Sequence, residues 1–392
     1  MYYDVIIVGS GFSGSILARK LAEEKNMKVL VIERRPHIAG NMYDEISEEG
    51  ILIQKYGPHF LNTNYWWIIE YLSQYSDMYE HSTKLLSYID GQYVQLPFNF
   101  RTMQQLVGAK KSEILLKKFR ENFTGRDRVP VLEIISHKDE DISNYGKLLF
   151  EKAFKTYISK MWGLNPEDLD VYVMNRVPMA LNYDERYLNK DFQYLPNNGF
   201  TKLFENMLNH KNITIELNTD AIPSISFNNE ENKAYYKGKE VKLLIFTGMI
   251  DELFAYKYGA LPYRSLDFKY ETVKANKVLP AEVCSYPQAE GYTRKTEYKW
   301  FNWHKKDCQY TTIVTEYPLQ YDKDAEVGNL PYYPIMSGEN NEIYQKYFKE
   351  SQQYKNLFLS GRLAEYKYFN MDVVIEHTFE RYKEIEEYLK KI

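Results

Sequence analysis

Short apolar runs and amphipathic stretches alternate over the first forty residues of the chain. Residues 3–8 form an apolar run rich in β-branched side chains, and residues 28–32 form another. Between them, residues 15–24 place apolar side chains at helical spacing with charged ones in between. This spacing predicts a helix. Strand, helix and strand in this order are typical of a parallel α/β unit.

The middle of the chain shows helical spacing instead. From about residue 102 to residue 169, charged residues separate apolar positions in a pattern that predicts several helices. The predicted helices span residues 103–107, 112–123, 131–135 and 145–161. Ser143 is a candidate N-cap for the last of them. We expect these helices to form a separate insert.

The second half of the chain returns to strands. Residues 243–246 predict a buried strand that ends in a glycine turn, which suits a return to the first domain. Asp90-Gly91, within residues 85–95, predicts a β-hairpin. Later alternating segments predict an antiparallel sheet. These segments are residues 265–271, 281–286, 293–300 and 311–317.

A glycine turn joins the first predicted strand to the first helix. Its sequence is Gly9-Ser10-Gly11-Phe12-Ser13-Gly14, and Glu33 follows the second strand. Gly9 permits a tight turn, Gly11 lets the backbone approach a pyrophosphate, and Gly14 allows close packing of helix on strand. The helix N-terminus offers amides to phosphates, and an acid at Glu33 accepts hydrogen bonds from a ribose. The pattern predicts a dinucleotide site, with a purely structural glycine turn as the alternative.

Residues after Glu33 favour FAD among the dinucleotides. Arg34 and Arg35 precede Ile38-Ala39-Gly40-Asn41, a second glycine turn directly after the acidic strand. This resembles flavoproteins whose FAD is held by the N-terminal strand–helix–strand unit, although an ordinary loop is the alternative for Gly40-Asn41. At the other end, residues 359–372 precede a helix whose N-terminus would stabilise negative charge on a reduced flavin.

We therefore predict an α/β fold, with an FAD-binding Rossmann-like domain, a helical insert domain and an antiparallel β-sheet domain. The FAD-binding domain is expected to comprise residues 1–80, 195–250 and 345–392. The helical insert is expected to span residues 97–180. The sheet domain, which would bind substrate, is expected to comprise residues 81–96, 181–194 and 251–344. A cleft between the three parts is the natural place for a ligand.

Composition and charge narrow the classes of function. The net charge of −4 gives no support for nucleic-acid binding. The chain lacks a long apolar stretch that would predict a membrane span, and its first residues lack the features of a signal peptide, so we expect a cytoplasmic protein. Two cysteines and seven scattered histidines predict neither a disulfide framework nor a metal site. The 37 tyrosines suit polar ligands in a cleft, or reflect AT-rich coding.

Short motifs in order along the whole chain resemble the UDP-galactopyranose mutase family. They are residues 9–14, Lys55-Tyr56-Gly57-Pro58-His59, Leu96-Pro97-Phe98-Asn99, Trp162-Gly163, Arg176-Val177-Pro178, residues 259–266, Thr315-Glu316-Tyr317-Pro318 and residues 361–368. The family interconverts UDP-galactopyranose and UDP-galactofuranose without net redox change, yet needs reduced FAD. The resemblance implies an isomerase in which flavin N5 forms a covalent adduct with the anomeric carbon while UDP leaves. It also implies a homodimer and a product used for cell-surface polysaccharides.

By the same resemblance, particular side chains bind the cofactor or the substrate. The predicted FAD-binding residues are Gly9, Gly11, Phe12, Ser13, Gly14, Glu33, Arg34, Gly40, Asn41, His59, Arg362 and Met371. The predicted substrate-binding residues are Phe154, Tyr157, Trp162, Arg176, Tyr187, Arg264, Arg294, Tyr317, Tyr368 and Asn370. Arg176, Arg264 and His59 are the predicted catalytic residues.

The resemblance also assigns a task to each part of the substrate set. Arg176 and Arg264 would flank the diphosphate, since a planar guanidinium binds phosphate oxygens in pairs. Phe154 and Tyr157 would hold the uracil, and Trp162 would lie under the sugar. Without the resemblance, these three residues at helical spacing would more often belong to a core.

Three positions depart from the family's usual residues. Ala180 stands where an Arg is usual, Asn62 where a His is usual, and Asn370 where an Asp is usual. The departures fall where the family grips the sugar and leave the cofactor motif unchanged. Three alternatives stay open. They are the same ring contraction on UDP-N-acetylgalactosamine or a dTDP-deoxyhexose, a flavin oxidoreductase of the amine oxidase type, and a cofactor-binding protein without catalysis.

Overall fold

The structure is a computed structural model that describes residues 3–163, 178–301, 303 and 307–392, with only the backbone of Trp162. Arg176 lies outside the described residues, and so does the side chain of Trp162. Within the described part, none of the helices has both the length and the apolar character needed to cross a membrane.

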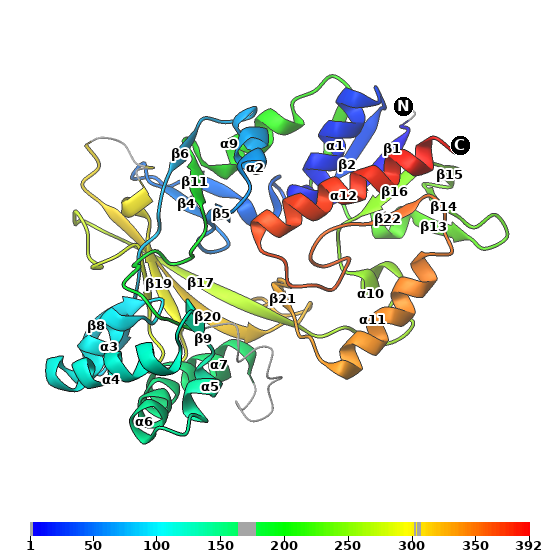
Figure 1. Cartoon of the computed structure of the whole chain (residues 1–392). Helices are drawn as coiled ribbons and strands as arrows, with labels where there is room; N and C mark the ends of the chain where they lie inside the picture. The colour runs from blue at the N-terminus through cyan, green and yellow to red at the C-terminus, as the bar shows by residue number, and fades with distance from the viewer. Residues whose placement is uncertain (1–2, 164–177, 302, 304–306) are drawn as a thin grey trace.

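A five-stranded parallel sheet forms the N-terminal unit. Its order is β12 (Ile213–Glu216), β2 (Val29–Ile32), β1 (Val5–Val8), β16 (Leu243–Phe246) and β22 (Leu357–Leu359). The direction of strand order reverses at β1, as in a Rossmann-like sheet. α1 (Phe12–Glu24) packs beside α12 (Met371–Leu389), where Leu17 and Leu21 share one apolar cluster with Tyr382 and Ile385 (Figure 1). The predicted Rossmann-like fold is confirmed.

A seven-stranded sheet forms the second large layer. Its order is β21 (Tyr333–Pro334), β17 (Tyr263–Val273), β20 (Thr311–Gln320), β19 (Arg294–Glu297), β18 (Val283–Ser285), β7 (Leu85–Ile89) and β8 (Gln92–Leu96). All neighbouring strands are antiparallel except β18 and β7. The hairpin turns at Asp90 and Gly91, whose φ angles of 50° and 81° suit a type I′ turn. The predicted hairpin and antiparallel sheet are confirmed.

Helices gather beside this sheet around a core of their own (Figure 1). They are α3 (Phe100–Val107), α4 (Ala109–Asn122), α5 (Val131–Ile135), α6 (Glu140–Leu149), a π-helical segment (Phe150–Phe154) and α7 (Lys155–Trp162). The cap of α6 corrects the prediction of Ser143. Asp139 accepts the amides of Asp141 and Ile142, whereas Ser143 lies one turn inside the helix and donates to the Ile135 carbonyl. An N-cap must precede the first turn.

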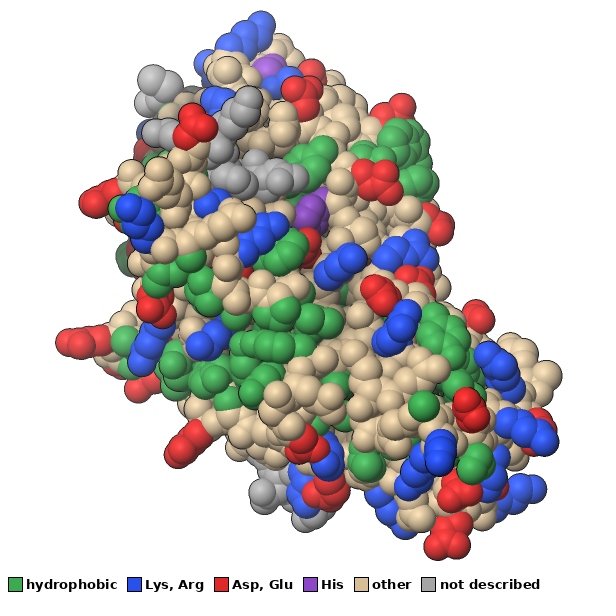
Figure 2. Space-filling view, turned by 90° about the vertical axis from the view of Figure 1, so that its left-hand side faces the viewer, with side chains coloured by type: hydrophobic (Ala, Val, Ile, Leu, Met, Phe, Trp, Pro, Cys, Tyr) green, Lys and Arg blue, Asp and Glu red, His purple; other side chains and the backbone are tan. Residues whose placement is uncertain are grey.

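Smaller elements complete the described chain. They are β3 (Asp44–Ile46) with β4 (Leu52–Gln54), β5 (Leu61–Thr63), β11 (Phe192–Pro196) and β6 (Met78–Glu80), α2 (Trp66–Ser73), β9 (Arg128–Val129) with β10 (Met179–Ala180), α9 (Gly199–Leu208), β13 (Ile225–Asn228), β14 (Lys233–Tyr236) and β15 (Lys239–Glu240), α10 (Ile250–Leu253), α11 (Gly338–Ser351), and 3₁₀ turns at Gly40–Met42, Ile222–Ser224 and Tyr298–Phe301. On the face shown in Figure 2, charges of both signs are interspersed around an apolar area. The division into three domains stays a prediction.

Candidate active site

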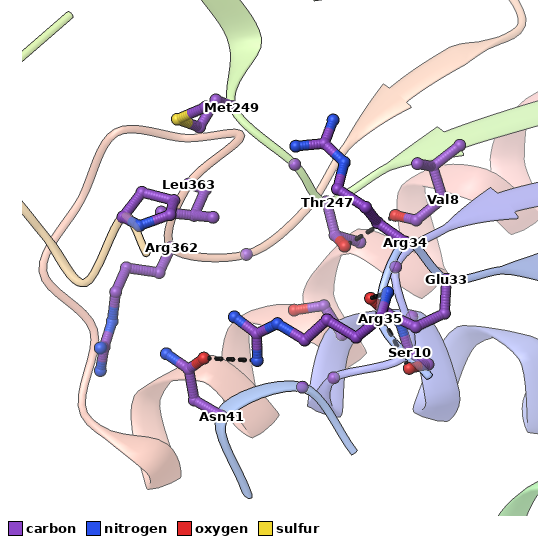
Figure 3. Close-up of a pocket in the computed structure, with 18 of the residues that line it drawn as sticks. Val8, Ser10, Glu33, Arg34, Arg35, Asn41, Thr247, Met249, Arg362 and Leu363 are labelled. Carbon is purple, nitrogen blue, oxygen red and sulfur yellow. Dashed lines mark hydrogen bonds between the residues drawn. The ribbon is translucent and has the colours of Figure 1, made fainter. Parts of the chain in front are cut away.

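A large cavity opens at the C-terminal ends of the parallel strands. Val8 of β1, Ile32 of β2 and Phe246 of β16 line it, and Figure 3 shows Val8 beside Thr247. Its empty volume, mouth included, is about 1600 Å³. Open α/β sheets bind ligands at this edge, where the strand order reverses. All the residues predicted to bind FAD line the cavity: Gly9, Gly11, Phe12, Ser13, Gly14, Glu33, Arg34, Gly40, Asn41, His59, Arg362 and Met371.

Each glycine of the turn is required for a different geometric reason. Gly9 has a φ of 102°, and a Cβ there would lie 2.0 Å from Thr247 Oγ1. A Cβ on Gly14 would lie 2.0 Å from the carbonyl oxygen of Gly9, so only glycine lets α1 pack this closely on the turn. A Cβ on Gly11 would meet no described atom within 4 Å. Gly11 therefore faces the open cavity, where a pyrophosphate would approach the backbone.

Glu33 ties the glycine turn to the end of β2. Its Oε2 accepts the Ser10 amide at 3.0 Å and the Ser10 hydroxyl at 2.7 Å, and its Oε1 accepts the Arg35 amide at 3.0 Å. A ribose hydroxyl at this carboxylate would join or replace the Ser10 hydroxyl. The sequence motif predicted roles for the glycines and for Glu33 but none for the Ser10 side chain.

The donors around the cavity fit a dinucleotide. The first turn of α1 has no side-chain cap, so its amides are available to an anion. Gly40 follows Ala39 in a left-handed turn, and a Cβ on Gly40 would lie 3.1 Å from the Gly11 Cα. The two glycine turns thus lie against each other at the place predicted for the pyrophosphate.

Arginine and tyrosine side chains converge where His59 and Arg362 line the cavity. The guanidinium of Arg362 lies 5.6 Å from the ring centre of Tyr333 and 5.4 Å from that of Tyr368. The two rings are stacked, with centres 5.2 Å apart. Tyr333 is paired with Arg264 in the register of β21 and β17. Tyr333 is therefore a neighbour of two predicted arginines of the site, Arg362 through its ring and Arg264 through its backbone.

His59 is a neutral imidazole in this setting. Burial, helped by the charges of Arg362 and Arg294, lowers its pKa to about 3. Nδ1 lies 2.8 Å from the Gly57 carbonyl, which can only accept, so Nδ1 carries the ring proton. Nε2 is then an acceptor. The ring adds no positive charge to the cavity.

Arg294 of β19 belongs to the same cluster. Its Nε donates to Glu316 Oε1 at 2.6 Å. Burial lowers the pKa of Arg294, but Glu316 and nearby phenols outweigh this and raise it well above its usual value. Tyr157 of α7 is close enough to sense Arg294, Tyr187 and Tyr368; burial raises the pKa of its phenol. Three other predicted substrate residues therefore lie within electrostatic range of Tyr157.

Arg264 of β17 reaches the end of α7. Its Nε donates to the Met161 carbonyl at 2.8 Å, and its Nη2 donates to the Lys160 carbonyl at 3.1 Å. A helix end leaves such carbonyls without partners, so the guanidinium caps α7. Gly163 follows with a φ of 66°, and a Cβ there would lie 2.7 Å from Nη1. Arg264 is only 6% exposed, and burial lowers its pKa.

Other predicted substrate residues lie away from this cluster or at its rim. Phe154 is buried in the helical core, with its ring 5.2 Å from that of Phe98. Tyr317 lies on the opposite face of β20 from Glu316, where the Lys269 ammonium is 4.6 Å from its ring centre. Asn370 is exposed at the start of α12. Their roles stay predictions.

Two positions that depart from the family pattern have local partners. The Asn62 amide donates to the Phe60 carbonyl at 3.2 Å, and Ala180 is buried in β10, where its amide donates to the Phe98 carbonyl at 2.7 Å. The sequence prediction also missed Tyr333 and Lys160. Tyr333 is one of many tyrosines, and no spacing marks it out. Only its contacts do.

Known proteins and family models match most of the chain. A family model described as UDP-galactopyranose mutase matches residues 152–368, and one described as an NAD(P)-binding Rossmann-like domain matches residues 7–75. The chain is 33% identical to the dTDP-fucopyranose mutase of Escherichia coli over 96% of both chains. It is also 33% identical to the UDP-galactopyranose mutase of Mycoplasma genitalium, over 95% of this chain and 92% of the relative.

The chain belongs to the UDP-galactopyranose mutase family. Its fold agrees: the crystal structure of a reduced UDP-galactopyranose mutase superposes with a TM-score of 0.70, covering 97% of this chain and 94% of that one at 16% identity. The predicted family is confirmed. Family membership favours a mutase over the amine oxidase alternative, since a shared fold does not by itself imply a shared function.

Proposed function

We propose that the chain interconverts the pyranose and furanose forms of a nucleotide sugar, with UDP-galactopyranose as the first candidate and FAD as cofactor. The observation that best supports this proposal is the way in which two arginines, Arg264 and Arg362, are held. Within the described residues, Arg264 and Arg362 donate to backbone carbonyls and form no ion pair with a neighbouring carboxylate. A buried cation without an anion is costly. The diphosphate of a nucleotide sugar would supply that anion.

The chain's own residues would then hold the substrate beside the cofactor. Arg264, Arg294 and Tyr368 would neutralise and orient the leaving diphosphate, which stabilises the charge that develops when it departs. Glu33 and the first turn of α1 would bind ribose and pyrophosphate of FAD. When bound, reduced FAD would supply the nucleophile for the anomeric carbon.

A dTDP-deoxyhexose is the second candidate substrate. It is supported by the Escherichia coli relative, which is named for dTDP-fucopyranose. It is also supported by Asn62, Ala180 and Asn370, which replace charged or ionisable residues of the family pattern. A sugar that lacks one hydroxyl has fewer groups to grip. The homodimer and the cytoplasmic location stay predictions.

The test uses the purified protein reduced with dithionite. UDP-galactopyranose and dTDP-fucopyranose are supplied separately, and pyranose and furanose forms are resolved by chromatography. We expect a furanose product from one of them under reducing conditions and little without reductant. The extracted cofactor should have the mass of FAD. Absence of any furanose from both sugars, with flavin bound and reduced, would contradict the proposal.

A further inference from the structure

The ammonium group of Lys160 is held in a cage of backbone carbonyls. Its Nζ lies 2.8 Å from the Tyr286 oxygen, 2.7 Å from the Ala289 oxygen and 2.7 Å from the Tyr292 oxygen. An ammonium has three hydrogens and accepts nothing, so all three donors are used. The carbonyls belong to the loop between β18 and β19. Lys160 thus joins the end of α7 to the antiparallel sheet.

The same residue is also held through its backbone. The Lys160 carbonyl accepts Nη2 of Arg264 at 3.1 Å. The last turn of α7 is therefore held by two cations. The Lys160 ammonium binds the loop carbonyls, and the Arg264 guanidinium, from β17, binds the Lys160 carbonyl. Tyr157 lies one turn earlier on α7, where burial raises the pKa of its phenol and the charge of Arg294 lowers it in part. A shift of this turn would move the Arg264 cap and the Tyr157 phenol together.

We propose that Lys160 is a positioning residue, which anchors the end of α7 to the 286–292 loop and so holds Arg264 and Tyr157 where the diphosphate binds. The second part rests on the proposed function. The loop also contacts another candidate, since the Tyr292 ring lies 5.9 Å from that of Tyr317. Burial lowers the pKa of Lys160 to about 8, so the group is an ammonium at neutral pH.

The test compares two lysines of the same helix. Lys160→Met keeps a long apolar stem and removes all three donors. Lys155→Met is the matched control, because Lys155 lies on α7 and pairs with Glu151 at 3.3 Å at the surface. Lys160→Arg keeps the charge, but a planar guanidinium cannot reproduce a compact ammonium. Partial recovery is expected from it.

Two readouts are measured well below the unfolding temperature. Amide hydrogen exchange of residues 155–163 should become faster in Lys160→Met and not in Lys155→Met. The Kd for UDP or dTDP should rise by about tenfold or more, since small displacements of binding groups have large effects. Bound flavin should be unchanged.

The outcomes separate this inference from the proposed function. If the unaltered protein binds nucleotide and Lys160→Met binds it equally well, the positioning role is overturned, whatever happens to exchange. If exchange is also unchanged, the anchor itself is overturned. If the unaltered protein binds neither UDP nor dTDP, the proposed function fails instead, and the exchange result still decides the anchor.

Discussion

The cavity at the strand ends and the arginine–tyrosine cluster are built in different ways. The cluster consists of Tyr157, Arg264, Arg294, Tyr333, Arg362 and Tyr368. The cavity is shaped by backbone: glycine turns, helix N-termini and strand ends, with Glu33 already tied to Ser10 and Arg35. The cluster is shaped by side chains from α7, β17, β19, β21 and the segment before α12. Its cations are partly held by carbonyls instead of carboxylates. The first region is a preformed cradle of backbone, and the second is a group of cationic and phenolic side chains for which we propose a diphosphate ligand.

The largest effect is expected when Arg264 is removed from the cluster. Arg264→Ala should lower kcat/KM for the nucleotide sugar by about a hundredfold, since a hydrogen bond to a charged group contributes up to about 3 kcal/mol. Bound flavin should be unchanged, because Arg264 is not among the residues that line the cavity. Steady-state kinetics and flavin absorbance check both.

Arg101→Ala is the control for Arg264. Arg101 is 52% exposed and lies 3.7 Å from Glu185, so its removal should leave kinetics unchanged. Near-normal turnover in Arg264→Ala would remove the diphosphate role. Loss of flavin in that variant would show that the two regions are not separable in the way described.

Glu316→Gln should destabilise the fold, because it removes the carboxylate partner of Arg294. Glu316 is 1% exposed and is the carboxylate partner of Arg294. Breaking such a pair leaves the cation of Arg294, which is only 26% exposed, without its partner, so the free energy of unfolding should fall by about 3 kcal/mol. Urea denaturation measures this. Glu271→Gln, an exposed change on β17, should have almost no effect, and equal stability of the two variants would contradict the prediction.

Two alanine substitutions in the glycine turn should separate folding from cofactor binding. Gly14→Ala brings its Cβ to 2.0 Å from the Gly9 oxygen, so stability should fall by about 2 kcal/mol. Gly11→Ala meets no described atom within 4 Å, so the fold should stay intact while flavin affinity drops. Thermal unfolding of the flavin-free protein and flavin titration distinguish them. Equal stability losses would mean that Gly11 also has a packing role.

The smallest effect is a pH dependence at the edge of the cavity. His377 Nε2 lies 2.6 Å from Glu365 Oε2, and Glu365 Oε1 accepts the amide of Gly361, which lines the cavity. The hydrogen bond to Glu365 raises the pKa of His377. The stabilising contribution is complete below the unfolded pKa of about 6.5. It is lost as pH rises through the higher folded pKa.

His377→Gln should remove that dependence. The difference in free energy of unfolding between the two proteins is expected to be below about 1 kcal/mol, because His377 is partly exposed. Denaturation at pH 6 and at pH 9 measures it. The difference should be larger at the lower pH; a difference that grows with pH would contradict the assigned direction.

Local patterns foretold the cavity better than the cluster. The glycine spacing, the apolar strand and Glu33 lie within one short segment, so periodicity and turn chemistry predict their arrangement. The predicted diphosphate residues came from a resemblance, and the structure groups them unevenly. Tyr157, Arg294 and Tyr368 meet, while Phe154 packs into the helical core and Tyr317 lies on the other face of β20. A tyrosine in a helix or strand looks the same in sequence whether it faces core or ligand.

By itself, the sequence determined the strand–turn–helix unit, the cofactor edge of the parallel sheet and the family. The strand–turn–helix unit depends on contacts between residues near in the chain, where steric and hydrogen-bonding rules act directly, and the family was recognised from motifs in order along the whole chain. Only the tertiary structure decided that Tyr333 neighbours both Arg362 and Arg264, that Arg264 caps α7 and that three loop carbonyls hold Lys160. The contacts of Lys160 and Arg264 join segments more than a hundred residues apart, and Tyr333 and Arg264 belong to different strands. No local rule specifies them, because they arise from how separate layers pack.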